Sequence, residues 1–213
     1  MARLVGPEGR VYALEPERRN FDLLRKNIAL NDLGERIEAF QLAGSDRTGS
    51  SSFFLSEYSN LHSFIPVSEG GKSIEVETTD LSTFLEGKPP IDLLRMDIEG
   101  FEVEVLKGLQ PAVEEGRFGG AIVFECHSPR YTDQHSMVEP LEWLFERGYR
   151  AAWLTSSHEG NRSLRERGYE PERVIAFDDR RSRGVYPDIS HRDAINLICE
   201  VGGVRDVVLL KGR

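Results

Sequence analysis

Residues 91–108 read IDLLRMDIEGFEVEVLKG, and this stretch decides the fold. It opens with a nearly continuous apolar run, made of Ile91, Leu93, Leu94, Met96 and Ile98. Such a run is typical of a strand that is covered on both faces. After Gly100, apolar residues recur at helical spacing, at Phe101, Val105 and Leu109. The stretch therefore predicts a buried strand, a sharp turn and an amphipathic helix that exposes Glu102, Glu104 and Lys107 to water.

Two acids, Asp97 and Glu99, stand where this strand should end, beside Gly100. Ligands of open α/β sheets bind at the carboxyl ends of the strands. Alternation along the strand predicts that both acids point to the same side. They could serve as a general base or as a metal-binding pair over a cofactor. Glu99 could equally interact with the dipole of the following helix. We favour a functional role for Asp97 and leave both roles open for Glu99.

The chain before this stretch predicts a strand–helix–strand unit. Residues 11–14 form a short apolar strand, a helix follows from residue 16 or 17 to about residue 30, and residues 37–42 form the next strand. This order is half of a doubly wound domain. Glu15 follows the first strand, where an acid can accept hydrogen bonds from ribose hydroxyls. A solvated acid that helps to start the helix explains Glu15 equally well.

Other polar residues follow two further strands. Ser45 and Asp46 come after the strand at 37–42, where Asp46 could accept from an adenine amino group, although turn formation explains it better. Glu125 and His127 end an apolar strand that begins near residue 121. His127 could act as a base near neutral pH, with a structural or exposed histidine as the alternative. The neighbouring Cys126 lacks the partner spacing of a zinc site, so the sequence predicts packing there and no metal.

Length and composition favour one soluble domain over residues 1–213. Within it we expect a small antiparallel β excursion at about 50–79 and a polar surface insertion at about 156–189, with one short strand near 174–177. The net charge of −9 argues against sequence-independent nucleic-acid binding, and no apolar run approaches the length of a membrane span. Two cysteines suit a reducing, cytoplasmic setting. The sequence leaves a homodimer open.

Several motifs together resemble the FkbM-like S-adenosylmethionine-dependent methyltransferases. They are VYALEP at 11–16, the residues Asn20, Phe21, Leu24 and Asn27 after it, TTDL at 78–81, and the stretch at 91–108 with its DIEGFE segment and its LKG. The match runs in register from about residue 3 to 127. The later part is similar in architecture only.

This resemblance implies a class I methyltransferase fold, a Rossmann-like doubly wound sheet that is mostly parallel with one antiparallel strand near the C-terminus. It implies that Glu15 holds the ribose of S-adenosylmethionine, with Ser45 and Asp46 near the adenine. Asp97 would lie near the methyl group and help to deprotonate or orient a hydroxyl acceptor. From the residues themselves, Glu99 and His127 join Asp97 as candidate catalytic residues. The expected activity is O-methylation of a sugar, glycan or natural product.

One departure from the family pattern concerns its first strand. The family begins with a strand and a glycine-rich turn ahead of the segment that matches residues 2–9, and neither is found here. We expect that first strand to lie upstream, and we expect its neighbours in this chain to lack a pairing partner. The alternative is a truncated, catalytically inactive binding protein. An NAD-dependent or nucleotide-sugar oxidoreductase is a weaker alternative, because it calls for a GxGxxG motif that the sequence does not show.

Overall fold

The structure is a computed structural model that describes residues 1–56, 62–65, 72–158, 162–178 and 181–212. The helices are α1 (Arg18–Leu30), α2 (Leu81–Phe84), α3 (Glu102–Glu114), α4 (Val138–Glu146) and α5 (His191–Ile195), with short 3-10 turns at Ser128–Arg130 and Arg165–Arg167 and a π-helical segment at Asn196–Val201. The strands are β1 (Val11–Leu14), β2 (Ile37–Phe40), β3 (Ala43–Ser45), β4 (Gly49–Phe54), β5 (Ser73–Asp80), β6 (Ile91–Met96), β7 (Phe118–Glu125), β8 (Tyr149–Ser156), β9 (Arg173–Ala176), β10 (Ser182–Ile189) and β11 (Val204–Lys211). No helix in these ranges is long and apolar enough to cross a membrane.

The largest sheet has the strand order β6-β7-β11-β8-β10-β9. Strands β6 and β7 are parallel, whereas β11 lies between β7 and β8 and is antiparallel to both. The predicted antiparallel strand near the C-terminus is therefore present as β11. The prediction that it is the single one is wrong, because β10 is antiparallel to both β8 and β9. The fold is α/β with a mixed sheet.

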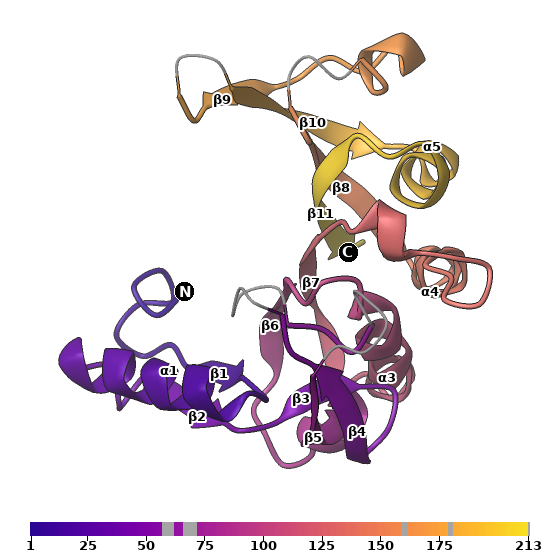
Figure 1. Ribbon diagram of the computed structural model, residues 1–213. Coiled ribbons are helices and arrows are strands. Elements are labelled where there is room, and N and C mark those ends of the chain that lie inside the picture. Colours follow the sequence, from indigo (N-terminus) through magenta and orange to yellow (C-terminus); the bar gives the residue numbers. More distant parts are fainter. Residues whose placement is uncertain (57–61, 66–71, 159–161, 179–180, 213) are drawn as a thin grey trace.

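The predicted continuous sheet is divided into three pieces. Strands β1 and β2 form a parallel pair, and β3, β5 and β4 form a separate three-stranded sheet. In Figure 1 the β1–β2 unit with α1 stands to one side of β6. Among the described strands, β1 pairs only with β2 and β6 only with β7. This one-sided pairing is what we expected for strands that lack a neighbour.

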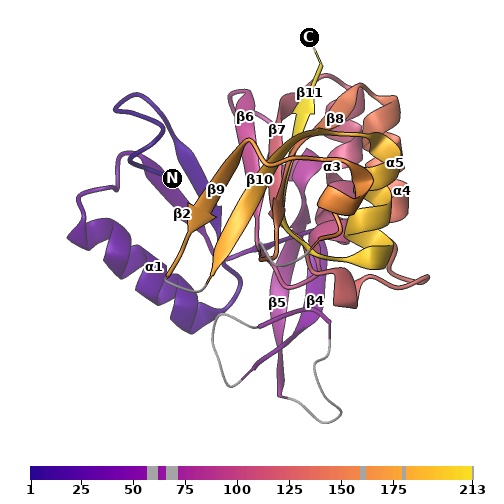
Figure 2. The same ribbon diagram turned by 90° about the horizontal axis from the view of Figure 1, so that it is seen from above.

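The prediction that β6 is covered on both faces is wrong. Leu94 and Met96 face the core, and Met96 is 4% exposed. Leu93 points to the opposite face and is 37% exposed. Figure 2 shows α3, α4 and α5 gathered on one side of the six-stranded sheet. An apolar run indicates a strand, but the run alone does not tell how many of its faces are covered.

The segment at 156–189 contributes more to the sheet than the predicted surface insertion would. The expected short strand is present as β9, and its residues are exposed. The second strand, β10, was not expected, and it pairs along β8 with Tyr186 and Ile189 buried. Gly184 and Pro187 interrupt the alternation of apolar and polar residues in β10, so the sequence pattern did not indicate a strand. In the excursion at 50–79, β4 and β5 form the expected antiparallel pair, while the predicted turn at 70–71 lies outside the described residues.

The β5–α2 junction supplies a pH-dependent test of stability. The Asp80 carboxylate caps α2 by accepting from the Thr83 backbone N–H at 2.8 Å, and it also accepts from the Thr48 hydroxyl at 2.9 Å. Burial opposes ionisation, but these hydrogen bonds outweigh it and lower the pKa of Asp80. A lowered pKa stabilises the fold above the unfolded value of about 3.9. That stability is lost as the pH falls through the folded pKa.

We expect Asp80→Ala to lower the free energy of unfolding by about 1 kcal/mol at pH 7, the usual cost of removing an N-cap. The difference from the unmodified chain should shrink as the pH falls below about 3.9, where the unfolded carboxyl becomes neutral, and towards the lowered pKa of the folded Asp80. Urea unfolding at pH 7 and pH 3 measures both values. Asp80→Asn retains a capping oxygen without the charge and is the matched control. An Asp80→Ala cost that is equal at both pH values would contradict the assignment.

Candidate functional site

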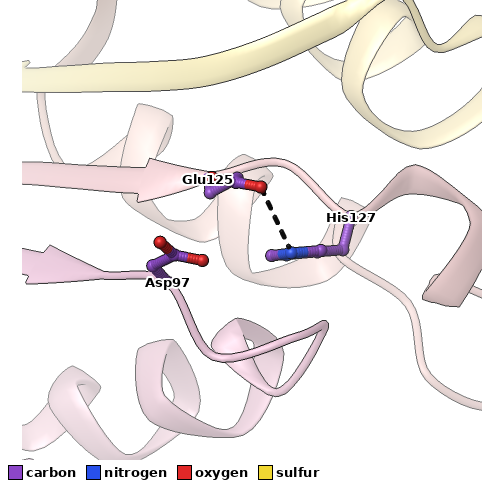
Figure 3. Close-up of side chains that lie close together, drawn as sticks. All are labelled: Asp97, Glu125 and His127. Atoms are coloured by element: carbon purple, nitrogen blue, oxygen red, sulfur yellow. Dashed lines mark ion pairs between the residues drawn. The ribbon is translucent and has the colours of Figure 1, made fainter. Parts of the chain in front are cut away.

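The parallel pair β6–β7 brings the candidate site together. Asp97 follows directly after β6 and Glu125 is the last residue of β7, so both lie at the carboxyl edge of the pair. His127 lies two residues after Glu125 in the chain. One ligand atom from each of these three side chains lies within 4.8 Å of the others. Figure 3 shows the three polar ends facing a common space. The structure thus unites Asp97 and His127, which are 30 positions apart in the sequence.

Glu99 reaches the same space through a turn rather than through strand alternation. Its φ is 57° and that of Gly100 is 97°, so both residues adopt the left-handed conformation. The Ser63 hydroxyl donates to the Glu99 carbonyl at 3.2 Å, and His135 Nε2 lies 2.7 Å from the Gly100 carbonyl. The turn places Glu99 Oε2 3.7 Å from His127 Nε2. Such a conformation persists only where the surroundings hold it, as happens at functional sites.

His127 is surrounded by carboxylates. Its Nδ1 is 3.2 Å from Glu102 Oε1, and its Nε2 is 3.6 Å from Glu125 Oε1. The side chain is only 11% exposed. The alternative that His127 is an exposed histidine therefore does not hold. Burial lowers the pKa of His127, but the hydrogen bond and charge of Glu102, followed by the charges of Glu99 and Glu125, outweigh it and raise the pKa.

Glu102 is the site residue that the sequence analysis missed. We expected it to face water, but it is fully buried. Its Oε1 accepts from the Ile98 backbone N–H at 3.0 Å as well as contacting His127. Helical periodicity identified the face of α3 that packs on the sheet, but it could not show that the loop after β7 covers the first turn of the helix. An acid in the first turn of a helix is common, so the sequence carried no distinctive signal.

Arginines neutralise part of the charge at this edge. Arg95 Nη2 is 3.1 Å from Asp97 Oδ2, and Arg205 forms an ion pair with Glu125. Burial is the largest cause of the raised pKa of Glu125, and the charge of Asp97 adds to it. The Cys126 side chain is buried, with Sγ 3.1 Å from the Ser128 hydroxyl, and burial raises the pKa of its thiol to about 11. This placement agrees with the predicted packing role of Cys126.

The predicted cofactor residues lie on the other two sheets. Glu15 follows β1, where its half-buried carboxylate accepts from the Glu17 backbone N–H at 2.9 Å. Burial is the largest cause of its raised pKa. Ser45 is buried at the end of β3 and its hydroxyl donates to Asp46, which is exposed. The predicted single strand at 37–42 ends at Phe40, so Ser45 belongs to a separate strand in another sheet and Asp46 follows that strand.

The turn at Gly100 offers a direct test of the site's backbone. A Cβ added at this position would lie 2.6 Å from Arg130 Cβ, in a conformation that already disfavours side chains. We expect Gly100→Ala to lower the free energy of unfolding by about 1–3 kcal/mol, the usual range for such backbone strain. Chemical denaturation of this variant and of Gly34→Ala measures the difference. Gly34 has open space around it and no positive φ, so equal values for the two variants would show that the turn is not constrained.

Comparison with known proteins places this chain in a family. A sequence profile described as the methyltransferase FkbM domain matches residues 1–151. The methyltransferase sdnD of Sordaria araneosa is 31% identical over 135 residues, which cover 48% of this chain and 52% of that protein. The crystal structure of methyltransferase FkbM from Methylobacillus flagellatus KT aligns at 18% identity with a TM-score of 0.41, over 62% of this chain and 30% of that chain. A SAM-dependent O-methyltransferase from Thermotoga maritima aligns at 16% identity with a TM-score of 0.41, over 100% of this chain and 53% of that chain.

The chain thus spans about half of the curated relative and less than a third of the FkbM structure. The profile match nevertheless extends from the first residue through β7 and α4 and into β8. It includes the 91–108 stretch and the site residues described above, with the exception of Arg205. Because this match covers well over half of its residues, the chain belongs to the family defined by the methyltransferase FkbM domain.

Proposed function

We propose that this chain carries the acceptor side of an S-adenosylmethionine-dependent O-methyltransferase that acts on a hydroxyl of a sugar, glycan or natural product. The observation that carries the proposal is the cluster of Asp97, Glu99, Glu125 and His127 at the carboxyl edge of β6 and β7. Ligands of α/β sheets bind at this edge. Membership of the FkbM methyltransferase family supplies the reaction class.

The cluster is suited to binding and deprotonating a hydroxyl group. Carboxylate oxygens accept hydrogen bonds from hydroxyls, and Asp97 is one-third exposed, so its oxygens are accessible to an acceptor. His127 keeps its proton to a higher pH than a free histidine, because carboxylates surround it. It therefore suits positioning better than proton abstraction, and we assign the acceptor proton to Asp97. Glu99 and His127 then orient the acceptor, and most of the catalytic gain comes from positioning.

The cofactor side of the proposal rests on Glu15. Its half-buried carboxylate follows the parallel strand β1, and an acid in this position has the chemistry to accept from ribose hydroxyls. S-adenosylmethionine would supply an electrophilic methyl group bound to its sulfonium sulfur. When the acceptor oxygen bonds to the methyl carbon, the carbon–sulfur bond breaks and S-adenosylhomocysteine leaves. The excess of carboxylates over guanidinium groups at the site is compatible with a cationic sulfonium. Ser45 and Asp46 stay predicted contacts of the adenine.

Calorimetric titration with S-adenosylmethionine tests the proposal. It is carried out on this chain and on the same chain extended at its N-terminus, with Glu15→Gln as the variant and Glu38→Gln, an exposed acid in β2, as the control. We expect saturable binding to at least one of the two forms and at least about tenfold weaker binding for Glu15→Gln, which corresponds to about 1.4 kcal/mol. Absence of binding by both forms would reject the enzyme and favour a binding protein that keeps the fold without the cofactor.

A further inference from the structure

The orientation of the His127 ring defines a space beside its Nε2 atom. Glu102 Oε1 lies 3.2 Å from Nδ1. An ionised carboxylate only accepts hydrogen bonds, so the Nδ1 atom carries a proton. Nε2 is then the ring atom that faces Glu125 and Glu99, at 3.6 and 3.7 Å. Both distances exceed the range of a good N–H···O hydrogen bond, which ends near 3.2 Å. The space between Nε2 and the carboxylates can therefore accept a small cation.

Glu102 holds the His127 ring from the side opposite this space. Its side chain is completely buried, and Oε2 has no hydrogen-bond partner among the described residues. A buried carboxylate with an unsatisfied oxygen is costly unless positive charge is nearby. Its contact with His127 Nδ1 also reproduces the arrangement in which a carboxylate fixes the ring of a metal-binding histidine. In that arrangement the opposite ring nitrogen is the ligand.

The charge at this edge is suited to a divalent ion. Asp97, Glu99, Glu102 and Glu125 contribute four carboxylates, whereas Arg95 and Arg205 contribute two guanidinium groups. A metal ion at Nε2 replaces any proton on that atom, and with the ring thus neutral the group has a charge of about −2, counting each ionised side chain once. Asp97, Glu125 and His127 place one possible ligand atom each within 4.8 Å of the others. Ligands about 2.1 Å from a common ion lie at most about 4.2 Å apart, so small side-chain rotations suffice.

We propose that Asp97, Glu125 and Nε2 of His127 bind a divalent transition-metal ion, with Glu102 as the residue that orients the His127 ring. Imidazole and carboxylate ligands together suit Mn²⁺ or Zn²⁺ better than Mg²⁺, which prefers oxygen ligands in octahedral geometry. Next to the proposed hydroxyl site, such an ion would polarise an acceptor oxygen. Metal binding itself does not depend on methyl transfer, and it is measured without S-adenosylmethionine or an acceptor.

Titration of the chelator-treated chain with Mn²⁺ tests the proposal, with free Mn²⁺ measured by electron paramagnetic resonance. We expect one ion per chain, displaced by Zn²⁺ at lower concentrations than by Mg²⁺. His127→Gln and Asp97→Asn should each weaken binding at least tenfold. Asp92→Asn and His158→Gln, which change an exposed acid on β6 and an exposed histidine, should leave it unchanged. Glu102→Gln should keep the stoichiometry and weaken binding by about 10–100-fold, as expected for a residue that acts through a ligand.

Zn²⁺ titration of the unmodified chain keeps the test independent of how the variants fold. Nitrogen-15 NMR should show Nε2 of His127 shifting with one equivalent of Zn²⁺, while the His158 ring stays unchanged. No binding of Mn²⁺ or Zn²⁺ at millimolar concentrations would overturn the proposal. So would tighter binding of Mg²⁺ than of Mn²⁺, or a Zn²⁺-loaded chain in which the His127 ring signals do not move. The metal titrations contain no S-adenosylmethionine, so a failure to bind metal leaves the S-adenosylmethionine proposal standing. A failure to bind S-adenosylmethionine likewise leaves the metal proposal standing.

Discussion

Gly108→Ala is expected to lower the free energy of unfolding by about 3 kcal/mol or more, at the upper end of overpacking costs. Gly108 lies inside α3, where alanine would normally be the better helix former by about 1 kcal/mol. A Cβ at this position would lie 2.0 Å from the Ser45 carbonyl oxygen and 3.2 Å from Asp46 Cα. These are backbone atoms of β3 and its continuation, which cannot move aside as the end of a side chain can. The helix and the strand would have to separate.

Urea unfolding followed by circular dichroism measures this cost, with Gly34→Ala as the control. Gly34 is exposed, has no positive φ and has no neighbouring atom within 4 Å of an added Cβ. Its substitution should change stability by less than about 0.5 kcal/mol, as is usual on a surface. If Gly108→Ala proves neutral or stabilising, the close packing of α3 on β3 is wrong. The position of Ser45 and Asp46 next to the helix would then be wrong as well.

Asp97→Asn is expected to reduce methyl transfer by about 100-fold or more, the range typical of losing a general base. The amide keeps the size of the side chain but cannot accept a proton from the acceptor hydroxyl. It also removes one negative charge from the group around His127. Release of S-adenosylhomocysteine from S-adenosylmethionine, measured with a panel of hydroxylated acceptors in a form that binds the cofactor, gives the turnover. Asp46→Asn should reduce that turnover far less.

Asp92→Asn is the matched control for this change. Asp92 is an exposed aspartate on β6, the strand that Asp97 follows, and its substitution should leave turnover unchanged. Circular dichroism of each variant separates loss of catalysis from loss of fold. Equally small effects at Asp97 and Asp46 would show that Asp97 is structural. In that case its ion pair with Arg95, at 3.1 Å, would be its main role.

The sequence by itself determined the local elements and the edge at which the site forms. The apolar run at 91–96 and the 3.6-residue period after Gly100 predicted β6 and α3, and both are present. The helix predicted from residue 16 or 17 to about residue 30 is present as α1, Arg18–Leu30. Asp97 follows its strand and Glu125 ends its own, as predicted. These features depend on hydrophobic periodicity and glycine placement, which are local properties of the chain.

Only the tertiary structure decided which side chains meet and which are covered. Glu102 looked like a solvent-facing acid, yet the loop after β7 buries it against His127. Glu99 reaches the site through left-handed backbone rather than through strand alternation. β10 enters the sheet because strand pairing joins segments that are distant in sequence. One face of β6 is left open, which the apolar run in β6 did not show. Periodicity specifies one face of one element, whereas the carboxylates around His127 come from β7, α3 and the turn between β6 and α3, and their proximity exists only once these have packed together.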